Sequence, residues 1–258
     1  MWSKTFKHIK FFFLLFSAAI NAEYQITVLA TNISNFGGFG EWSFSALYES
    51  DNESILFDTG FHEDTVLHNA KVLNKDLSKV NKVVLSHFHS DHTGGLIKLR
   101  KTFKDINKDA FSKVYVARGF FDQRYKKDGT KEGPGNFDDS LEFKKVAEEE
   151  GIKFIILDDY KMVAKNIYAT GTVDRKIEYY NGPKGLYIDK EFKVPDIIKD
   201  DQSVGMLTDK GWIMMSGCGH SGIINTAKKL QEIKDVPVYG AIGLSLIHIS
   251  EPTRQAEI

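Results

Sequence analysis

The sequence predicts a layered α/β domain, and three observations support this class. Short apolar runs at 55–57 and 83–85 have the composition of buried strands, and residues 62–73 have the apolar spacing of a helix. The alternation of strand-like and helix-like segments continues along most of the chain, as expected where helices cover sheets. Residues 23–243 have a length typical of one domain with a sizeable core.

The other elements of the first half follow the same two periodicities. Residues 25–29 and 42–48 alternate apolar and polar side chains, which predicts half-buried strands. Residues 95–103 are expected to form a helix, and 113–117 a further strand. Residues 119–136 are polar, basic and rich in glycine, which predicts a surface loop.

The second half is predicted to mix strands and helices. A helix is expected at 140–150, followed by strands at 154–157 and 166–170. Residues 203–207 and 212–215 are expected to form a hairpin that turns at Asp209-Lys210-Gly211. Residues 223–233 are expected to form the last helix.

A cluster of three histidines and one aspartate follows the apolar run 83–85. His87, His89, Asp91 and His92 fall within six residues, although the whole sequence holds 8 histidines. Imidazole nitrogen and carboxylate oxygen are ligands that zinc prefers. A set of surface or helix-capping polar residues is the alternative, but it accounts for one histidine better than for three. The cluster therefore predicts a metal site.

The spacing within this cluster suggests two positions for metal. In an extended segment, side chains at i and i+2 point the same way, so His87 and His89 can bind one ion. Asp91 and His92 fall where the chain turns, and they can face a second position. Thr93-Gly94-Gly95 are expected to supply the flexible backbone for that turn.

The motif His87-x-His89-x-Asp91-His92 resembles the signature of the metallo-β-lactamase superfamily. Residues 54–60 resemble the strand that ends in an aspartate before the signature, and residues 217–222 resemble the later strand end that carries a third histidine. The lead-in at 76–80 resembles one subgroup, the 7,8-dihydropterin-6-methyl-4-(β-D-ribofuranosyl)aminobenzene-5'-phosphate synthase-like proteins.

This resemblance extends from about residue 24 to about residue 243, and it implies a four-layer αββα sandwich that is truncated at its C-terminal end. It implies that His87, His89 and His220 hold a first metal ion with one position open for water, the arrangement of a catalytic zinc. Asp91 and His92 would hold a second ion. The implied cofactor is Zn²⁺, as one or two ions, with Mn²⁺ or Fe²⁺ as alternatives.

The function that the resemblance implies is a metal-dependent hydrolase. Such an enzyme would use a metal-bound hydroxide on an ester, lactone, amide or phosphodiester, with Asp91 as both ligand and general base. A dihydropterin-pathway synthase and a non-catalytic metal-binding protein stay open as alternatives. The net charge of −1 gives no indication of nucleic-acid binding, so the expected partner is a small-molecule substrate. The sequence leaves the oligomeric state open.

Two further residues have two interpretations each. Asp58 follows the strand 55–57, where it would either orient a ligand histidine or accept backbone N–H bonds in the turn. Cys218 is the only cysteine. It is either a soft ligand beside His220 or a small buried apolar side chain, and the second is expected.

Residues 119–136 are expected to lie over the site as a lid. Arg124 and Tyr125 in this segment are the candidates for binding an anionic substrate, with a solvated loop face as the alternative. Asp201 and Gln202 resemble a polar pair before the late hairpin of the subgroup, and the sequence assigns them no role.

The two ends of the chain differ from the domain between them. Residues 1–22 predict a secretory signal peptide, because basic residues precede a short apolar run and Ala22 offers a cleavage site. The protein would then be exported to a periplasm or the extracellular space and would meet a membrane only during export, with an uncleaved anchor as the alternative. Residues 244–258 do not resemble the family and look like translated vector sequence, so His248 is not expected to be a ligand.

Overall fold

The computed structural model describes residues 24–34, 36–50 and 53–244. The predicted signal peptide and all but the first residue of the 244–258 tail lie outside these ranges, so both assignments stay predictions. Within the described ranges, no helix has the length and apolar character needed to cross a membrane.

The first sheet has six strands, and its parallel part leads to the histidine motif. Its order is β1 (Gln25–Ala30), β2 (Ser45–Glu49), β3 (Ser54–Phe57), β4 (Lys82–Val84), β5 (Lys113–Ala117) and β8 (Lys153–Leu157). β3, β4, β5 and β8 run parallel, whereas β1 and β2 are antiparallel to their neighbours. The carboxyl ends of β3 and β4 therefore meet at one edge of the sheet, the edge where α/β folds bind ligands.

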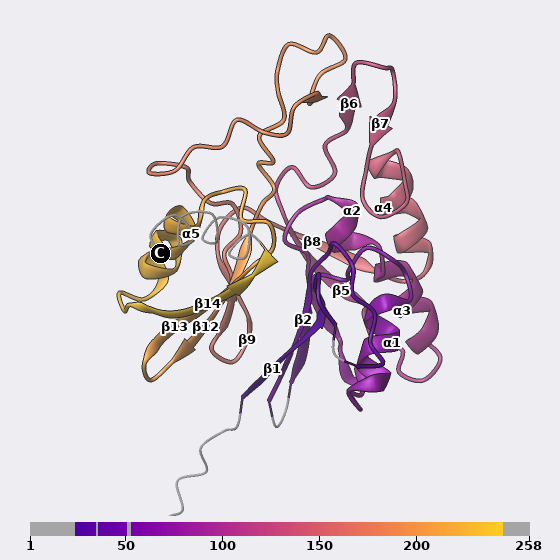
Figure 1. Cartoon of the computed structure of the whole chain (residues 1–258), viewed down its shortest axis with the longest axis vertical. Coiled ribbons are helices and arrows are strands. Elements are labelled where there is room, and N and C mark those ends of the chain that lie inside the picture. The colour runs from indigo at the N-terminus through magenta and orange to yellow at the C-terminus, as the bar shows by residue number, and fades with distance from the viewer. Residues whose placement is uncertain (1–23, 35, 51–52, 245–258) are drawn as a thin grey trace, which may run out of the picture.

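The second sheet has five strands and faces the first (Figure 1). Its order is β14 (Val238–Gly243), β13 (Gly211–Ser216), β12 (Ser203–Thr208), β10 (Ile167–Ala169) and β9 (Lys161–Ala164). β13 and β14 are parallel, and the other pairs are antiparallel.

Three apolar clusters separate four layers. Leu56 of β3 packs in a cluster with the helices α1 (Thr65–Val72), α3 (Leu96–Phe103) and α4 (Ser140–Glu149). Its neighbours Ile55 and Phe57 point to the other face and pack against the second sheet. Trp212 and Leu230 join β13 to α5 (Ile223–Ile233) on the outer side. The αββα sandwich is thus confirmed (Figure 1).

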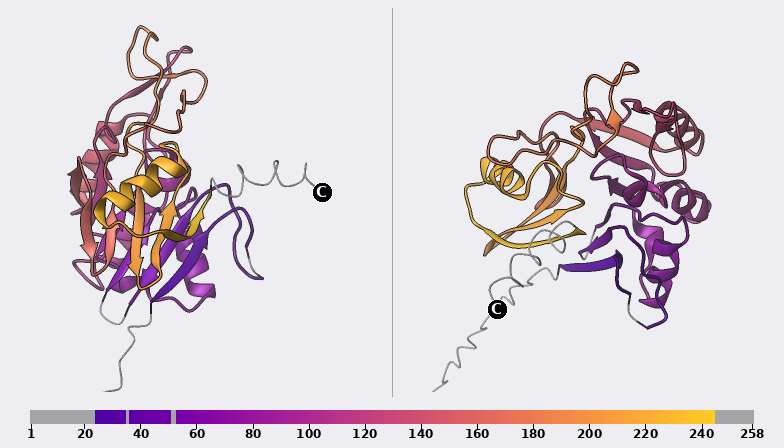
Figure 2. Two further views of the ribbon diagram at one scale, coloured as in Figure 1. Left: turned by 90° about the vertical axis from the view of Figure 1, so that its left-hand side faces the viewer. Right: turned by 45° about the horizontal axis from the view of Figure 1, so that its top comes forward.

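A third, small sheet stands apart from the two large ones. It consists of β11 (Leu186–Tyr187), β6 (Arg124–Lys126) and β7 (Lys131–Glu132). Figure 2 shows this sheet and the long segment between β10 and β12 projecting from one end of the sandwich. We refer to residues 119–136 and 180–195 together as the arm.

Most of the predicted elements are confirmed, and the last predicted helix has the bounds of α5. The expected surface loop at 119–136 instead contains β6 and β7, whose two or three residues are too short for a periodic pattern. β9, β11 and β14 were likewise not predicted. The strand expected at 42–48 begins at Ser45, because the Phe44 N–H donates to the carbonyl of Asp91, 3.2 Å away, and not to a neighbouring strand.

Residues 90–93 form the short helix α2, and a 3₁₀ turn, η1 (Leu77–Lys79), precedes β4. Gly94 and Gly95 follow α2 with φ angles of −61° and −82°, which any residue adopts. The chain does turn at these two residues, as expected, but the turn does not need the wider range of φ that glycine allows. A Cβ on Gly94 would lie 1.8 Å from the carbonyl oxygen of Phe61, so glycine is required here for close backbone approach.

Candidate metal centre

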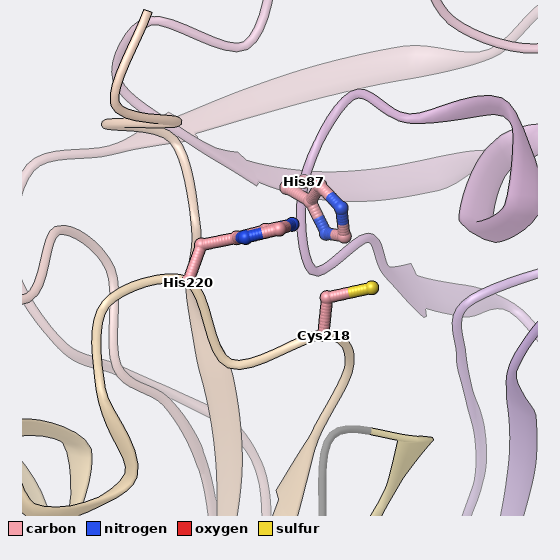
Figure 3. Close-up of side chains that lie close together, drawn as sticks. All are labelled: His87, Cys218 and His220. Atoms are coloured by element: carbon pink, nitrogen blue, oxygen red, sulfur yellow. The ribbon is translucent and has the colours of Figure 1, made fainter. Parts of the chain in front are cut away.

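The histidine motif lies at the end of β4 in the first sheet, and Cys218 and His220 lie after the end of β13 in the second. The packing of the two sheets brings these strand ends together, with their side chains directed toward one another (Figure 3). The ring centroid of His87 is 4.4 Å from that of His92, 4.6 Å from that of His89 and 4.8 Å from that of His220. All the predicted ligands thus meet around His87.

The donor atoms fall into two overlapping groups. Those of His87, Cys218 and His220 lie within 4.8 Å of one another, and so do those of His87, Asp91 and His92. His87 belongs to both groups. His89 also contacts it, because His87 Nε2 and His89 Nδ1 are 2.9 Å apart.

Cys218 combines the two interpretations that the sequence left open. It packs against the apolar cluster between the two sheets. Its Sγ also lies 3.1 Å from Nε2 of His92. The thiol is therefore available as a soft donor beside the imidazoles, although burial raises its pKa.

Asp58 lies against a histidine of the motif, and the backbone N–H that it accepts comes from the residues after β4 and not from its own turn. Its Oδ2 is 2.6 Å from Nδ1 of His92, which directs the other ring nitrogen of His92 toward Asp91 and Cys218. Its Oδ1 accepts the backbone N–H of Ser86 at 2.6 Å. The Ser86 hydroxyl donates to Asp58 Oδ2 and lies 2.9 Å from Nδ1 of His87. Asp58 thus fixes one histidine directly and supports a second through Ser86.

Burial keeps three of the imidazoles in the form that binds metal. It lowers the pKa of His87 and of His220 well below the ordinary value, and the neighbouring imidazoles act in the same direction. Burial also lowers the pKa of His89 to about 4. These side chains are therefore neutral at pH 7, with a lone pair for a cation.

The motif's other two residues carry opposite charges. Burial acts to lower the pKa of His92, but the electrostatic interactions with Cys218, Asp58 and Asp91 outweigh it and raise that pKa well above its ordinary value. Burial acts to raise the pKa of Asp91, but the charge of His92 outweighs it and lowers the pKa. Asp91 is thus a carboxylate at neutral pH, and a metal ion would displace the proton of His92.

Two buried polar atoms next to His87 have no hydrogen-bond partner among the described residues. They are Nε2 of His220 and Oδ1 of Asp201, and the second lies 3.9 Å from Nδ1 of His87. Unpaired buried polar atoms are rare in folded proteins, so these two atoms are expected to have a further partner such as a bound ion. The donor set and these two atoms together fit a divalent cation bound between the two sheets.

The sequence did not assign a role to Asp201, and the structure places it at the site. It is fully buried, and its Oδ2 accepts the backbone N–H of Ser221 at 2.8 Å. Burial raises its pKa to about 6. A polar pair directly before β12 was the only signal in the sequence, because its proximity to His87 depends on how the sheets pack.

Arg124 does not have the expected role of a substrate contact. It is 1% exposed, and its guanidinium binds Asp196 at 2.9 Å and Asp200 at 2.6 Å. It also lies 3.8 Å from the ring centroid of Phe88 within the motif. Its donors are occupied, because it also contacts three backbone carbonyls of the preceding turn. Arg124 therefore fastens the arm to the motif.

A cavity of about 700 Å³ opens above the motif. Tyr125 is not among its lining residues, and its ring faces the ammonium of Lys190 at 6.0 Å. The cations that line the cavity are lysines of the arm. The full lining is Trp42, Phe61, His89, Ser90, Asp91, Lys126, Lys127, Asp128, Glu132, Pro183, Lys184, Gly185 and Leu186.

Comparisons with known proteins agree with this geometry. The family model of the metallo-β-lactamase superfamily matches residues 43–108. A Methanocaldococcus jannaschii protein named 7,8-dihydropterin-6-methyl-4-(β-D-ribofuranosyl)-aminobenzene-5'-phosphate synthase is 30% identical over 194 residues, which cover 73% of this chain. The match spans 64% of that protein's length, less than two thirds of it.

Two further relatives match over more of their length. An uncharacterized protein of Methanocaldococcus jannaschii is 33% identical over 222 residues, which cover 82% of this chain and 77% of that protein. A solved structure described as a metal-dependent hydrolase of the β-lactamase superfamily is 25% identical, with a TM-score of 0.67. That match covers 91% of this chain and 81% of the other.

Proposed function

Because this chain belongs to the metallo-β-lactamase superfamily, we propose that it is a metal-dependent hydrolase of a small ester, lactone, amide or phosphodiester. The observation that carries this proposal is the meeting of four imidazoles, a carboxylate and a thiol from two sheets beside a cavity of about 700 Å³. A cavity of this size suits a small organic molecule.

We assign the metal to His87, His89, Asp91, His92, Cys218 and His220. A bound divalent ion would supply a Lewis acid that polarises a substrate oxygen and lowers the pKa of a bound water to about 7. The donor set of imidazoles, carboxylate and thiol favours Zn²⁺, with Mn²⁺ or Fe²⁺ as alternatives.

Asp91 is the residue to which we assign proton transfer. It lines the cavity, and its Oδ2 is 3.4 Å from Nε2 of His92. Its lowered pKa keeps it charged at neutral pH, so it can accept a proton from a water molecule in the cavity. Asp58 and Ser86 hold the imidazoles in place during this step.

Metal analysis and a substrate panel test this proposal together. We expect the unaltered chain to bind metal and to turn over a phosphodiester or a lactone, because both bonds are cleaved by addition of water. The double variant His87→Ala/His220→Ala should lose metal and turnover. His68→Ala removes an imidazole outside both the cluster and the cavity and should keep both metal and turnover. Wild-type metal stoichiometry in the double variant would refute the site.

A second candidate function is supported by the relative that is named a synthase. A synthase joins two substrates, so it would show turnover only when both are supplied and none of the hydrolytic assays would respond. A metal-loaded chain that is inactive on every hydrolytic substrate, but forms a condensation product from a dihydropterin and an aminobenzene ribofuranosyl phosphate, would favour this candidate over the hydrolase.

A further inference from the structure

The cavity above the metal centre has an aromatic part and a cationic part. From these we infer, given the proposed function, that the substrate is an amphiphilic anion. Its aromatic or heteroaromatic group packs against Trp42 and Phe61, and its anionic group, a phosphoryl or a carboxylate group, is bound by Lys127 and Lys184.

The aromatic part consists of two rings that are open to solvent although they line the cavity. Trp42 is 62% exposed and Phe61 is 37% exposed. Large apolar side chains left exposed at the wall of a cavity indicate a surface that binds a ligand. Flat rings favour stacked or edge-to-face contact with another ring.

Glu41 holds the two backbone segments that carry these rings. Its Oε1 accepts the backbone N–H of Phe61 at 2.8 Å, and its Oε2 accepts that of His62 at 3.1 Å. The Thr65 hydroxyl donates to the same carboxylate at 2.7 Å. Glu41 directly precedes Trp42, so its hydrogen bonds hold the backbone at Phe61 next to the backbone at Trp42. The aromatic part is therefore in place before a ligand arrives.

The cationic part lies on the arm, where strand pairing brings its residues together. β6 and β11 are antiparallel, with Lys126 opposite Leu186. Lys127 directly follows β6, and Lys184 lies two residues before β11, so this pairing brings both residues to the same end of the small sheet. Both lysines are exposed and line the cavity, so two ammonium groups lie at one side of it.

The charges of these two lysines are not neutralised within the described part of the chain. Lys127 lies 5.5 Å from the ring centroid of Tyr187, and neither it nor Lys184 forms an ion pair with a described carboxylate. The two acids of the arm that line the cavity are engaged elsewhere. Glu132 binds Lys126 at 2.7 Å, and Asp128 accepts two hydrogen bonds from Thr130. The arm therefore presents net positive charge to an anion.

The candidate metal centre opens into the same cavity as the aromatic part and the cationic part. His89 and Asp91 line the same cavity as the two rings and the two lysines. A ligand with one flat group and one anionic group would contact both parts and remain next to Asp91. A ligand that lacks either group loses one set of contacts, which predicts selectivity for molecules that have both.

Binding of ligands that cannot be hydrolysed tests this inference independently of turnover. Phenylphosphonate, methylphosphonate, benzoate and phenol are titrated by calorimetry into the metal-loaded full chain. We expect phenylphosphonate to bind about tenfold more tightly than methylphosphonate, because only it contacts the rings. Phenol, which is uncharged at pH 7, should bind weakest. Comparing benzoate with phenylphosphonate shows whether the site prefers a carboxylate or a phosphoryl group.

Variants locate the two groups of the ligand. Trp42→Ala should remove most of the preference for phenylphosphonate over methylphosphonate, while Tyr239→Ala, which removes an exposed ring outside the cavity, should keep it. The double variant Lys127→Gln/Lys184→Gln should weaken the binding of both phosphonates by about tenfold or more. Lys190→Gln removes an exposed lysine of the arm that does not line the cavity, and should weaken neither.

Tryptophan fluorescence gives a second readout. Of the three tryptophans in the sequence, Trp212 is fully buried, so a change on adding phenylphosphonate that is lost in Trp42→Phe would place the ring beside Trp42. Equal affinities for the two phosphonates in the unaltered chain, or no effect of the double lysine variant, would overturn the inference. If the binding preferences hold but no substrate is hydrolysed, the proposed hydrolase fails while the ligand class stands.

Discussion

Asp58 and Asp201 are both fully buried beside the histidine cluster, but their surroundings differ. Both oxygens of Asp58 accept hydrogen bonds, from Ser86 and from His92. One oxygen of Asp201 accepts from Ser221, and the other has no partner among the described residues. Asp58 is therefore satisfied without a metal ion, whereas Asp201 gains a favourable interaction only when positive charge is nearby.

Asp58→Asn should weaken metal binding while keeping the fold. The amide can still accept the Ser86 N–H, and asparagine tolerates the positive φ of 58° at this position. His92 loses its charged partner, and changes of this kind commonly lower metal affinity about 10–100-fold. Competition with a chelator of known affinity measures the change. Asp76→Asn, which alters an exposed cap of η1, is the control, and equal affinity in the two variants would contradict the role of Asp58.

Asp201→Asn should have opposite effects on the metal-free and metal-bound chain. The pKa of Asp201 rises from 3.8 to about 6 on folding, because burial disfavours its charged form. The folded chain therefore holds this proton more tightly than the unfolded chain. Between about pH 4 and pH 6 Asp201 ionises in the unfolded chain but stays protonated in the folded chain, so the free energy of unfolding falls as pH rises. Above about pH 6 it falls no further on account of this residue.

The asparagine variant cannot ionise, so it avoids this loss. The variant and the unaltered chain are compared without metal. The difference between their free energies of unfolding should shift in favour of the variant by up to about 3 kcal/mol from pH 4 to pH 7. In the metal-bound state the variant should bind the ion less tightly, because a nearby negative charge is gone. Denaturant unfolding at both pH values with chelator present measures the first effect. A difference that does not change with pH would show that Asp201 does not titrate in this range.

At the scale of secondary-structure elements, Arg124 connects β6 to the segment that precedes β12 and to the histidine motif that follows β4. It extends from β6 to Asp196 and Asp200, and Asp200 in turn accepts the backbone N–H of Phe88 in the histidine motif at 2.8 Å. The arm that carries Lys127 and Lys184 is thus tied to the segment that carries the proposed metal ligands of the first sheet. This link was not apparent in the sequence, where Arg124 lies among other basic residues.

Arg124→Met should therefore destabilise the fold strongly. Removal of one partner from a buried ion pair leaves charges without compensation, which typically costs about 3–5 kcal/mol. Here two carboxylates would lose their partner. Thermal and denaturant unfolding measure the change, with Arg118→Met as the control, because Arg118 pairs with Asp158 on the surface. Comparable stability of the two variants would show that Arg124 does not fasten the arm.

The same scale shows which elements the sequence could predict. The strands before Asp58 and His87 were predictable, because apolar runs that end in polar residues are typical of strands leading to a site. β6, β7 and β11 were not, because each has only two or three residues, and because the pairing of β6 with β11 joins residues about 60 apart in the chain. Gly94 looked like a turn residue, but only the proximity of Phe61 shows why a side chain cannot be accommodated.

At the scale of the whole molecule, the site exists only where the two sheets meet. His87 and His220 were predictable one by one, because each follows a strand and belongs to a recognisable motif. Their grouping with Cys218 and Asp201 was not predictable, since it depends on the distance between the sheets. The apolar cluster between the sheets sets that distance, so substitutions in this cluster should alter the metal centre from afar.

A metal ion bound to both strand ends would join the two sheets and should stabilise the whole fold. An ion that binds only the folded chain adds about 4 kcal/mol at a free concentration of 1,000 times its Kd. For a domain of this size each kcal/mol raises Tm by about 2–4 °C, so chelation should lower Tm by about 10 °C. Differential scanning calorimetry with and without chelator measures this shift.

The double variant Cys218→Ala/His220→Ala removes both ligands that come from the second sheet, and it provides the critical comparison. In this variant any remaining ion is held by the first sheet alone, through His87, His89, Asp91 and His92. Its Tm should therefore respond much less to the chelator than that of the unaltered chain. If both proteins contain metal and chelation lowers both Tm values equally, the ion does not link the sheets. The stabilisation would then come from ordering the histidine motif after β4.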